Sequence, residues 1–167
     1  MTRSVEHKFL QQQGFTDEQA ENAKRHFNAL LFQPIIVGSM ILIGIITQSA
    51  TIFMVFGLIL WVNTLLPQFN IFEIVYNATF RLMRNEPRLE SAPMPRRFMQ
   101  GMAGTLMLGV AFTLFLGWNG LSYVLQGFVA VAFTALLFGK FCVGAFIYHY
   151  LIGNAKYANE TCPWSKG

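Results

Sequence analysis

The sequence predicts an all-α integral membrane protein with four transmembrane helices arranged as two hairpins. Two observations support this fold class. Only 12% of the 167 residues are charged while 54% are hydrophobic, whereas soluble domains carry roughly 25% charged residues. Asp, Glu, Lys and Arg are also absent between Arg25 and Glu73, and again between Arg97 and Lys140. Because one helical pass needs about 20 mostly apolar residues, each charge-free run is long enough for two passes.

The placement of basic residues predicts the orientation of the chain. The turns expected near residues 47–51 and 117–122 carry no charge, whereas the segment between the hairpins is rich in arginine. Positively charged flanks stay on the cytoplasmic side, so we expect both termini and this central segment to face the cytosol. The first 26 residues are too polar for a secretory signal. The first transmembrane segment is therefore expected to direct its own insertion.

Residues 1–31 are predicted to form cytosolic amphipathic helices, followed by the first hairpin over residues 32–67. Thr16 and Gln19 have the spacing of a capping box at a helix start. Pro34 is expected to kink or restart the helix where it enters the bilayer. The hairpin is expected to turn near Ser49.

Residues 68–97 are predicted to form an interfacial helix and a Pro-rich connector. The pattern of residues 70–84 is that of an amphipathic helix lying on the membrane surface. Asn70 can cap this helix together with Glu73. Residues 84–97 contain three of the six prolines of the chain, so this stretch is predicted to be extended.

Residues 98–153 are predicted to form the second hairpin, with a turn at residues 119–120 and a cytosolic extension of its last helix. Residues 154–167 form the C-terminal tail. Folding the hairpin about its turn places Lys140 level with Met99, and Cys142 level with Arg97. A lysine at the bilayer centre costs at least about 2.5–3.5 kcal/mol, so Lys140 is expected to mark the exit from the membrane. The apolar residues 141–153 then need a cover, for which the helices at the N-terminus and at 70–84 are available.

Two sets of residues are predicted to place the chain in the membrane. Small residues let helices pack closely where lipid provides no hydrophobic drive for association, and long basic side chains reach lipid head groups. The helix-packing candidates are Ala132, Ala135, Gly139, Gly101 and Gly104. The head-group candidates are Arg81, Arg84, Arg96, Arg97 and Lys140.

Cys142 has two interpretations that the sequence leaves open. It continues the spacing of the small residues before it, and a free cysteine commonly behaves as a small apolar side chain. Alternatively, Arg97 and Lys140 lower its pKa and His149 acts as a base, which would make Cys142 a nucleophile. Cys162 is available to resolve an oxidised Cys142, but nothing in the spacing requires this pairing.

Two segments carry recognisable short elements: residues 91–104 contain Arg-Phe-x-Gln at 97–100, and residues 138–151 contain Phe-Cys-x-Gly at 141–144. In these elements the chain resembles a bacterial integral-membrane family catalogued as domain of unknown function four-three-nine-five. The resemblance extends over about residues 50–152 and implies a multi-pass protein of the bacterial cytoplasmic membrane. Many relatives carry a second cysteine where this chain has Ala145, so the resemblance does not support a dithiol mechanism. It implies no particular activity.

The first functional hypothesis is a non-catalytic accessory or scaffold subunit that packs against membrane partners. Its expected partners are the lipid bilayer and either another membrane protein or a second copy of the chain, with no nucleic acid. No cofactor or metal is expected, because His7, His26 and His149 form no ligand pair at helical spacing. The alternative hypothesis is thiol redox or sulfur-handling chemistry at the cytosolic interface, with Cys142, His149, Arg97 and Lys140 as catalytic candidates. A transporter is less well supported, because the sequence shows no interrupted helices or buried polar groups of the kind such sites use.

Overall fold

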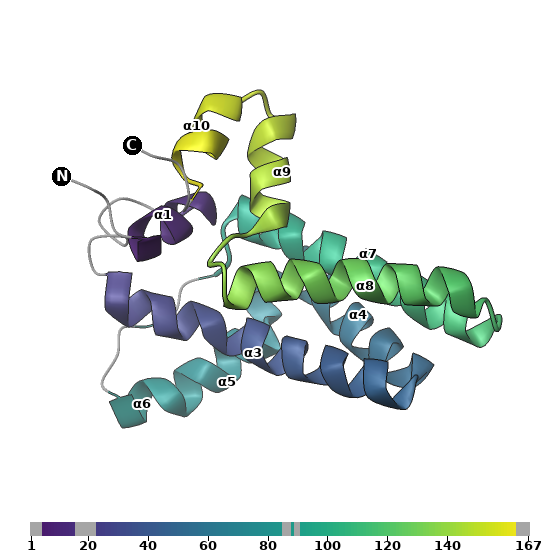
Figure 1. Ribbon diagram of the computed structural model, residues 1–167. Coiled ribbons are helices and arrows are strands. Elements are labelled where there is room, and N and C mark those ends of the chain that lie inside the picture. The colour runs from purple at the N-terminus through teal and green to yellow at the C-terminus, as the bar shows by residue number, and fades with distance from the viewer. Residues whose placement is uncertain (1–4, 16–22, 85–87, 89–90, 163–167) are drawn as a thin grey trace.

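The computed structural model describes residues 5–15, 23–84, 88 and 91–162, and the regular structure within these ranges is helical (Figure 1). The long helices α3, α4, α7 and α8 run side by side, while the shorter helices, including α1 and α10 at the two ends of the described chain, gather at one end of this bundle (Figure 1). The elements are α1 (Val5–Gln12), α3 (Ala23–Thr47), α4 (Ala50–Leu65), the short 3-10 helix η1 (Pro67–Phe69), α5 (Ile71–Ala78), α6 (Phe80–Arg84), α7 (Met94–Phe115), α8 (Asn119–Leu137), α9 (Val143–Leu151) and α10 (Ala155–Glu160).

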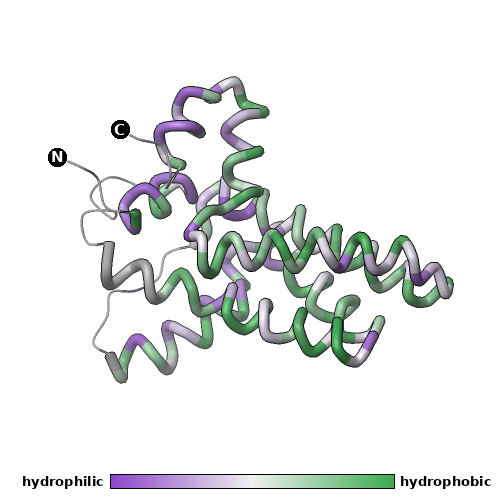
Figure 2. Tube along the Cα trace, viewed as in Figure 1, coloured by the Kyte–Doolittle hydropathy of each residue, from purple (hydrophilic) through white to green (hydrophobic). Residues whose placement is uncertain are grey.

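The structure confirms the helical, membrane-type character of the chain. Among the described residues, the stretches Ala29–Thr47, Met94–Phe115 and Asn119–Leu137 are long and apolar enough to cross a bilayer. The helix α4 is also apolar, but its 16 residues are fewer than the about 20 that one pass requires. Apolar residues dominate the long helices, whereas hydrophilic residues are concentrated in α1, α10 and the end of the α5–α6 segment (Figure 2).

A core of apolar side chains joins the four long helices. Its buried members include Val37 and Ile41 of α3, Leu60 of α4, Met107 of α7 and Val129 of α8. The pairs α4–α7 and α3–α8 pack along each other, and α7 also contacts α8 and α9. The helix α7 is therefore the central element of the fold.

Two helix backbones approach closely where Gly57 of α4 faces Gly104 of α7. A Cβ atom added to Gly104 would lie 3.0 Å from the backbone oxygen of Gly57. One turn away, a Cβ atom added to Gly101 would lie 3.2 Å from the Thr64 side chain. Such small residues allow two helix backbones to pack closely in a membrane.

The segment after α4 forms two short helices, α5 and α6, separated at Thr79. Asn70 caps α5: its Oδ1 accepts a hydrogen bond from the Phe72 backbone N–H at 3.1 Å, and its Nδ2 donates to Glu73 Oε1 at 3.0 Å. Phe72 and Glu73 face the bundle, whereas Ile71, Ile74 and Leu82 are exposed. This arrangement leaves an apolar outer face on the segment, as expected for a helix at a membrane surface.

The structure differs from the sequence-based expectation in the Pro-rich connector. The helix α7 begins at Met94 instead of after Arg97, with Pro95 in its first turn. Proline is well tolerated there, because the first backbone N–H groups of a helix have no intrahelical acceptor. Pro34 likewise lies inside α3 without ending it. The capping box predicted at Thr16 and Gln19 lies outside the described residues.

The predicted continuous helix through residues 141–153 is wrong. The helix α8 ends at Leu137, and Lys140 adopts a left-handed conformation with φ of 50°. The helix α9 then begins at Val143, capped by Cys142, whose Sγ accepts a hydrogen bond from the Ala145 backbone N–H at 3.4 Å. The tail continues into α10, which packs on α9.

A buried polar cluster and cavity at the end of the bundle

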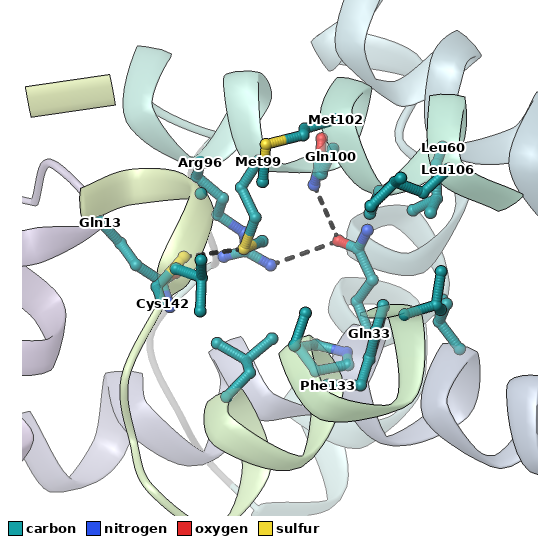
Figure 3. A pocket seen from close by; sticks show the side chains of 18 residues that line it. Gln13, Gln33, Leu60, Arg96, Met99, Gln100, Met102, Leu106, Phe133 and Cys142 are labelled. Atoms are coloured by element: carbon teal, nitrogen blue, oxygen red, sulfur yellow. Dashed lines mark hydrogen bonds between the residues drawn. The ribbon is translucent and has the colours of Figure 1, made fainter. Parts of the chain in front are cut away.

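A cavity of about 50 Å³ lies between α3, α4, α7, α8 and the start of α9 (Figure 3). Most of its wall is apolar, and its polar side chains come from the segment after α1, from α3 and from α7. The apolar lining includes Val37, Leu60, Leu106, Val129, Phe133 and Leu136. Gln13, Gln33, Arg96 and Gln100 supply the polar groups. The surface of the cavity is therefore almost entirely apolar, with a few buried polar groups beside it.

Gln33 links the polar residues of α7 to α3. Arg96 and Gln100 lie one turn apart, so they share one face of α7. Both donate to the same acceptor: Gln33 Oε1 accepts a hydrogen bond from Gln100 Nε2 at 3.0 Å and another from Arg96 Nη2 at 3.4 Å (Figure 3). Gln100 and Arg96 are each only 1% exposed. Arg96 Nη1 and Gln100 Oε1 have no hydrogen-bond partner in the described part of the chain.

The position of Arg96 corrects its predicted role as a lipid head-group contact. A head-group contact would require an exposed guanidinium, but this side chain is enclosed within the bundle. Its neighbour Arg97 turns the other way and donates from Nε and Nη2 to the backbone oxygen of Thr64, at 3.0 and 2.8 Å. Arg97 thereby satisfies a carbonyl in the last turn of α4, where helices lack intrahelical donors.

Glu73 is a buried carboxyl group on the α5 side of this cluster. Burial raises its pKa from the usual 4.5 to about 7, while the positive charge of Arg96 and the hydrogen bond from Asn70 act in the opposite direction. The carboxyl group is therefore partly protonated at neutral pH, and it neutralises the buried arginine only in part.

Cys142 is a buried thiol in contact with three helices. Its Sγ donates to Met99 Sδ at 2.9 Å, and its backbone N–H donates to Gln12 Oε1 at 2.9 Å (Figure 3 shows the sulfur contact). The thiol is 1% exposed. Burial raises its pKa to about 12, an effect that the hydrogen bond from Ala145 and the charge of Arg96 offset only partly. Its contacts are those of a capping and packing residue.

The catalytic candidates do not gather around Cys142 as predicted. The arginine whose charge acts on the thiol is Arg96 and not Arg97. Lys140 is half-buried in the linker before α9. His149 is buried on α9, where its Nε2 lies 3.0 Å from the Gln12 carbonyl oxygen. Because a carbonyl only accepts, Nε2 is the protonated nitrogen and Nδ1 carries no proton in the neutral ring.

The helix-packing candidates fall into two groups. Gly101 and Gly104 are buried on α7 against α4. Ala132 and Ala135 are half-buried on α8, and Gly139 lies in the linker after it. Because α8 ends at Leu137, the small-residue spacing does not form one continuous helix face up to His149.

The remaining candidates lie away from the cavity. Arg81 is half-buried on α6, and the side chain of Arg84 lies outside the described residues. No disulfide joins Cys142 to Cys162, which is half-buried after α10. No group of three or more His, Cys, Asp or Glu residues within the described ranges has a metal-binding arrangement.

Sequence reasoning missed the amide residues that organise this site. Gln33 was not singled out, and Gln100 entered only as the last residue of the Arg-Phe-x-Gln element. Asn63, which lies outside the site and is 1% exposed on α4, was also missed. The available signal was their position: each is an uncharged polar residue inside a charge-free run or at its edge. Polar side chains in such segments usually face the interior of the bundle and pair with one another.

The two segments that carry the family resemblance meet at this site. Met99 contacts the Cys142 thiol, and the Phe98 and Tyr148 rings lie 5.6 Å apart between their centroids. A Cβ atom added to Gly144 would lie 3.0 Å from Met99 Cα, so a glycine at this position lets α9 approach α7 closely. The two elements thus form one contact between α7 and the start of α9.

Comparison with known families decides the assignment of the chain. Its residues 8–152 match the family described as domain of unknown function (DUF4395). The chain belongs to the DUF4395 family. The DUF4395 match begins in α1 and extends just past α9, so it includes Gln33, Arg96, Gln100 and Cys142. No curated protein and no solved structure shows significant similarity to the chain.

Proposed function

We propose that this DUF4395 member is a small, non-catalytic accessory or scaffold subunit of the bacterial cytoplasmic membrane. The observation that carries this proposal is the large apolar outer surface of the long helices. Ile46, Phe112, Phe128 and Val131 are each more than half exposed, with 80%, 61%, 63% and 69% of their surface accessible. Contiguous apolar surface of this kind marks contact with a membrane or with another protein.

The proposed arrangement in the membrane has four passes as two hairpins, with both termini inside the cell. The turn between α3 and α4 and the turn between α7 and α8 lie at the same end of the bundle (Figure 1). The described chain ends, α6 and the arginine-bearing start of α7 lie toward the other end (Figure 1), and the distribution of positive charge favours the cytosol for this end. The helix α4 spans only about 24 Å at 1.5 Å per residue, so we propose that η1 completes this pass at the interface.

The outer face of α8 is the surface that we propose meets a protein partner or a second copy of the chain. Phe128 points outward on this helix, whereas the adjacent Val129 is 1% exposed inside the core. A photo-crosslinking residue at position 128 is expected to capture one protein in stoichiometric yield in intact membranes. The same residue at position 129 is the matched control and, because Val129 lies inside the core, is expected to form crosslinks only within one chain.

Two outcomes would contradict the accessory role. One is capture of lipid alone at position 128. The other is purification of the chain in mild detergent as a monomer without a bound partner.

The alternative hypothesis, thiol chemistry at Cys142, is less well supported. A nucleophilic cysteine requires a thiolate and access to its substrate. Cys142 is buried, its pKa is raised to about 12, and its sulfur is engaged with Met99 and the Ala145 N–H. We therefore do not assign Cys142 a catalytic role.

A further inference from the structure

We propose that the cavity beside Arg96 binds a small organic monocarboxylate, with its carboxylate on the guanidinium and its apolar chain between α3 and α8. This binding site goes beyond the accessory role and does not depend on it.

The first argument is the incomplete pairing of a buried charge. Arg96 makes one hydrogen bond within the described part of the chain, at 3.4 Å to a neutral amide, and its Nη1 has no partner. A buried guanidinium is strongly disfavoured unless an anion and further hydrogen bonds compensate for the lost water. Glu73 supplies its charge only in part, because its pKa of about 7 leaves it partly protonated at neutral pH. A bound anion would complete the pairing.

The second argument is that the Arg96 side chain lines a partly enclosed pocket. The Arg96 guanidinium lies at the rim of the cavity between Met99 and Gln33 (Figure 3). The cavity volume of about 50 Å³ is room for about four water molecules, since each needs roughly 10–15 Å³ by this measure. This space matches a carboxylate and the first carbons of its chain, and the rest of a longer chain would extend out of the pocket, which is only partly enclosed.

The third argument concerns the chemical class of the ligand. The rest of the wall is formed by aliphatic and aromatic side chains such as Val37, Leu106 and Phe133, which favour an apolar body. One arginine matches a single negative charge, and its planar N–H groups fit a carboxylate well. A multiply charged anion such as a phosphate dianion would place some of its oxygen atoms against the apolar wall, where no donor is available to them. A monocarboxylate with an apolar chain fits both sides.

Such an acid can reach the cavity from two sources, as a fatty acid from the bilayer or as a short-chain acid from the cytosol. The full-length chain, purified in a non-ionic detergent, is titrated with decanoate and separately with butyrate. Binding is measured by native mass spectrometry and by the shift in the unfolding temperature. Saturable binding of decanoate supports the proposal with a bilayer source, and binding of butyrate alone supports it with a cytosolic source.

Two variants test the site by charge and by volume. Arg96→Gln removes the charge and is expected to weaken binding about 10- to 100-fold, as for loss of a charged hydrogen bond. Ala132→Phe fills the cavity from α8 and is expected to abolish binding while leaving Arg96 in place. Val131→Phe, at the next residue on the exposed face of the same helix, is the matched control and is expected to bind normally.

The volume variant keeps the proposal testable if Arg96→Gln fails to fold. The proposal is overturned if neither acid binds, which would mean that the cavity holds water alone. It is also overturned if the Ala132→Phe variant binds the acid as tightly as the Val131→Phe variant does. Crosslinking at position 128 reports on the accessory role separately, so failure of either proposal is recognised independently.

Discussion

At the scale of single residues, Cys142 illustrates how burial determines reactivity. Its backbone and sulfur connect α1, α7 and α9 through contacts with Gln12, Met99 and Ala145. Desolvation disfavours a thiolate more than the nearby charge of Arg96 favours it. The chemistry of this residue is therefore set by the packing of three helices that are distant in the sequence.

This arrangement predicts that Cys142 resists alkylation in the folded protein. With a pKa of about 12, the thiol has almost no thiolate at pH 7, and its burial blocks the reagent. Mass spectrometry after brief treatment with iodoacetamide is expected to find Cys142 unmodified in detergent at pH 7 and modified after unfolding. Modification of the folded protein at the rate of an exposed cysteine would contradict this.

The raised pKa of Glu73 predicts that the stability of the fold depends on pH. Its pKa is about 7 in the folded chain and near 4.5 when unfolded, so the folded state holds its proton more tightly. The stabilisation from this proton is complete below pH 4.5 and is lost as the pH rises through 7. The unfolding temperature of the wild type is expected to fall between pH 5 and pH 8. Glu73→Gln keeps an acceptor for Asn70 and is expected to show a smaller decline; an equal decline in both proteins would exclude Glu73 as the cause.

At the scale of elements, the α4–α7 contact depends on two facing glycines. Gly104→Ala would place a Cβ atom 3.0 Å from the Gly57 backbone oxygen, and overpacking of this kind typically costs about 1–3 kcal/mol. Gly127→Ala is the matched control on α8, because no atom lies within 4 Å of its added Cβ. Thermal unfolding in detergent is expected to show a loss of stability for Gly104→Ala and no loss for Gly127→Ala. Equal effects would show that the close approach is unimportant.

Arg97 of α7 forms a second contact with α4, and we expect this contact to stabilise the fold. Its guanidinium donates twice to the Thr64 carbonyl near the end of α4, and a hydrogen bond from a charged donor contributes roughly 1.5–3 kcal/mol. Arg97→Gln is expected to lower the free energy of unfolding by about this amount. Arg88, which is exposed in the connector, provides the control Arg88→Gln, for which a change within about 0.5 kcal/mol is expected. Similar effects of the two substitutions would argue against the contact.

The elements also show which local features the sequence could predict. The cap formed by Asn70 and Glu73 depends on residues three positions apart, and both residues take part in it. Its bonds differ from those of a capping box, because Asn70 accepts from the Phe72 N–H, and Glu73 accepts from the Asn70 side chain while the Asn70 backbone N–H donates to Pro67. The break after α8 was not predicted, because residues 138–142 stay largely apolar and contain no proline. The backbone changes direction at Lys140, whose left-handed conformation is rare for a side-chain-bearing residue. Only Gly139 gave a local signal of this break.

At the scale of the whole molecule, composition and charge segregation predicted the membrane-type helical fold, but not the interior. The rule that arginines flank membrane segments on the cytosolic side placed Arg96 and Arg97 together. The structure separates them, because Arg96 turns toward Gln33 of α3 and Arg97 toward Thr64 of α4. These partners lie 63 and 33 residues away in the sequence. Burial of Arg96 therefore follows from helix packing that one sequence does not reveal.

The central claim is that the bundle crosses the membrane with its polar cluster at the cytosolic end and the α7–α8 turn at the other. Single cysteines at Arg88 and Gly120, introduced into a Cys142→Ser, Cys162→Ser chain, test it with a membrane-impermeant maleimide. Both positions are exposed, and no atom lies within 4 Å of a Cβ at Gly120. Position 88 is expected to react only in inverted vesicles and position 120 only in intact spheroplasts. Reaction of both positions from the same side would contradict the account.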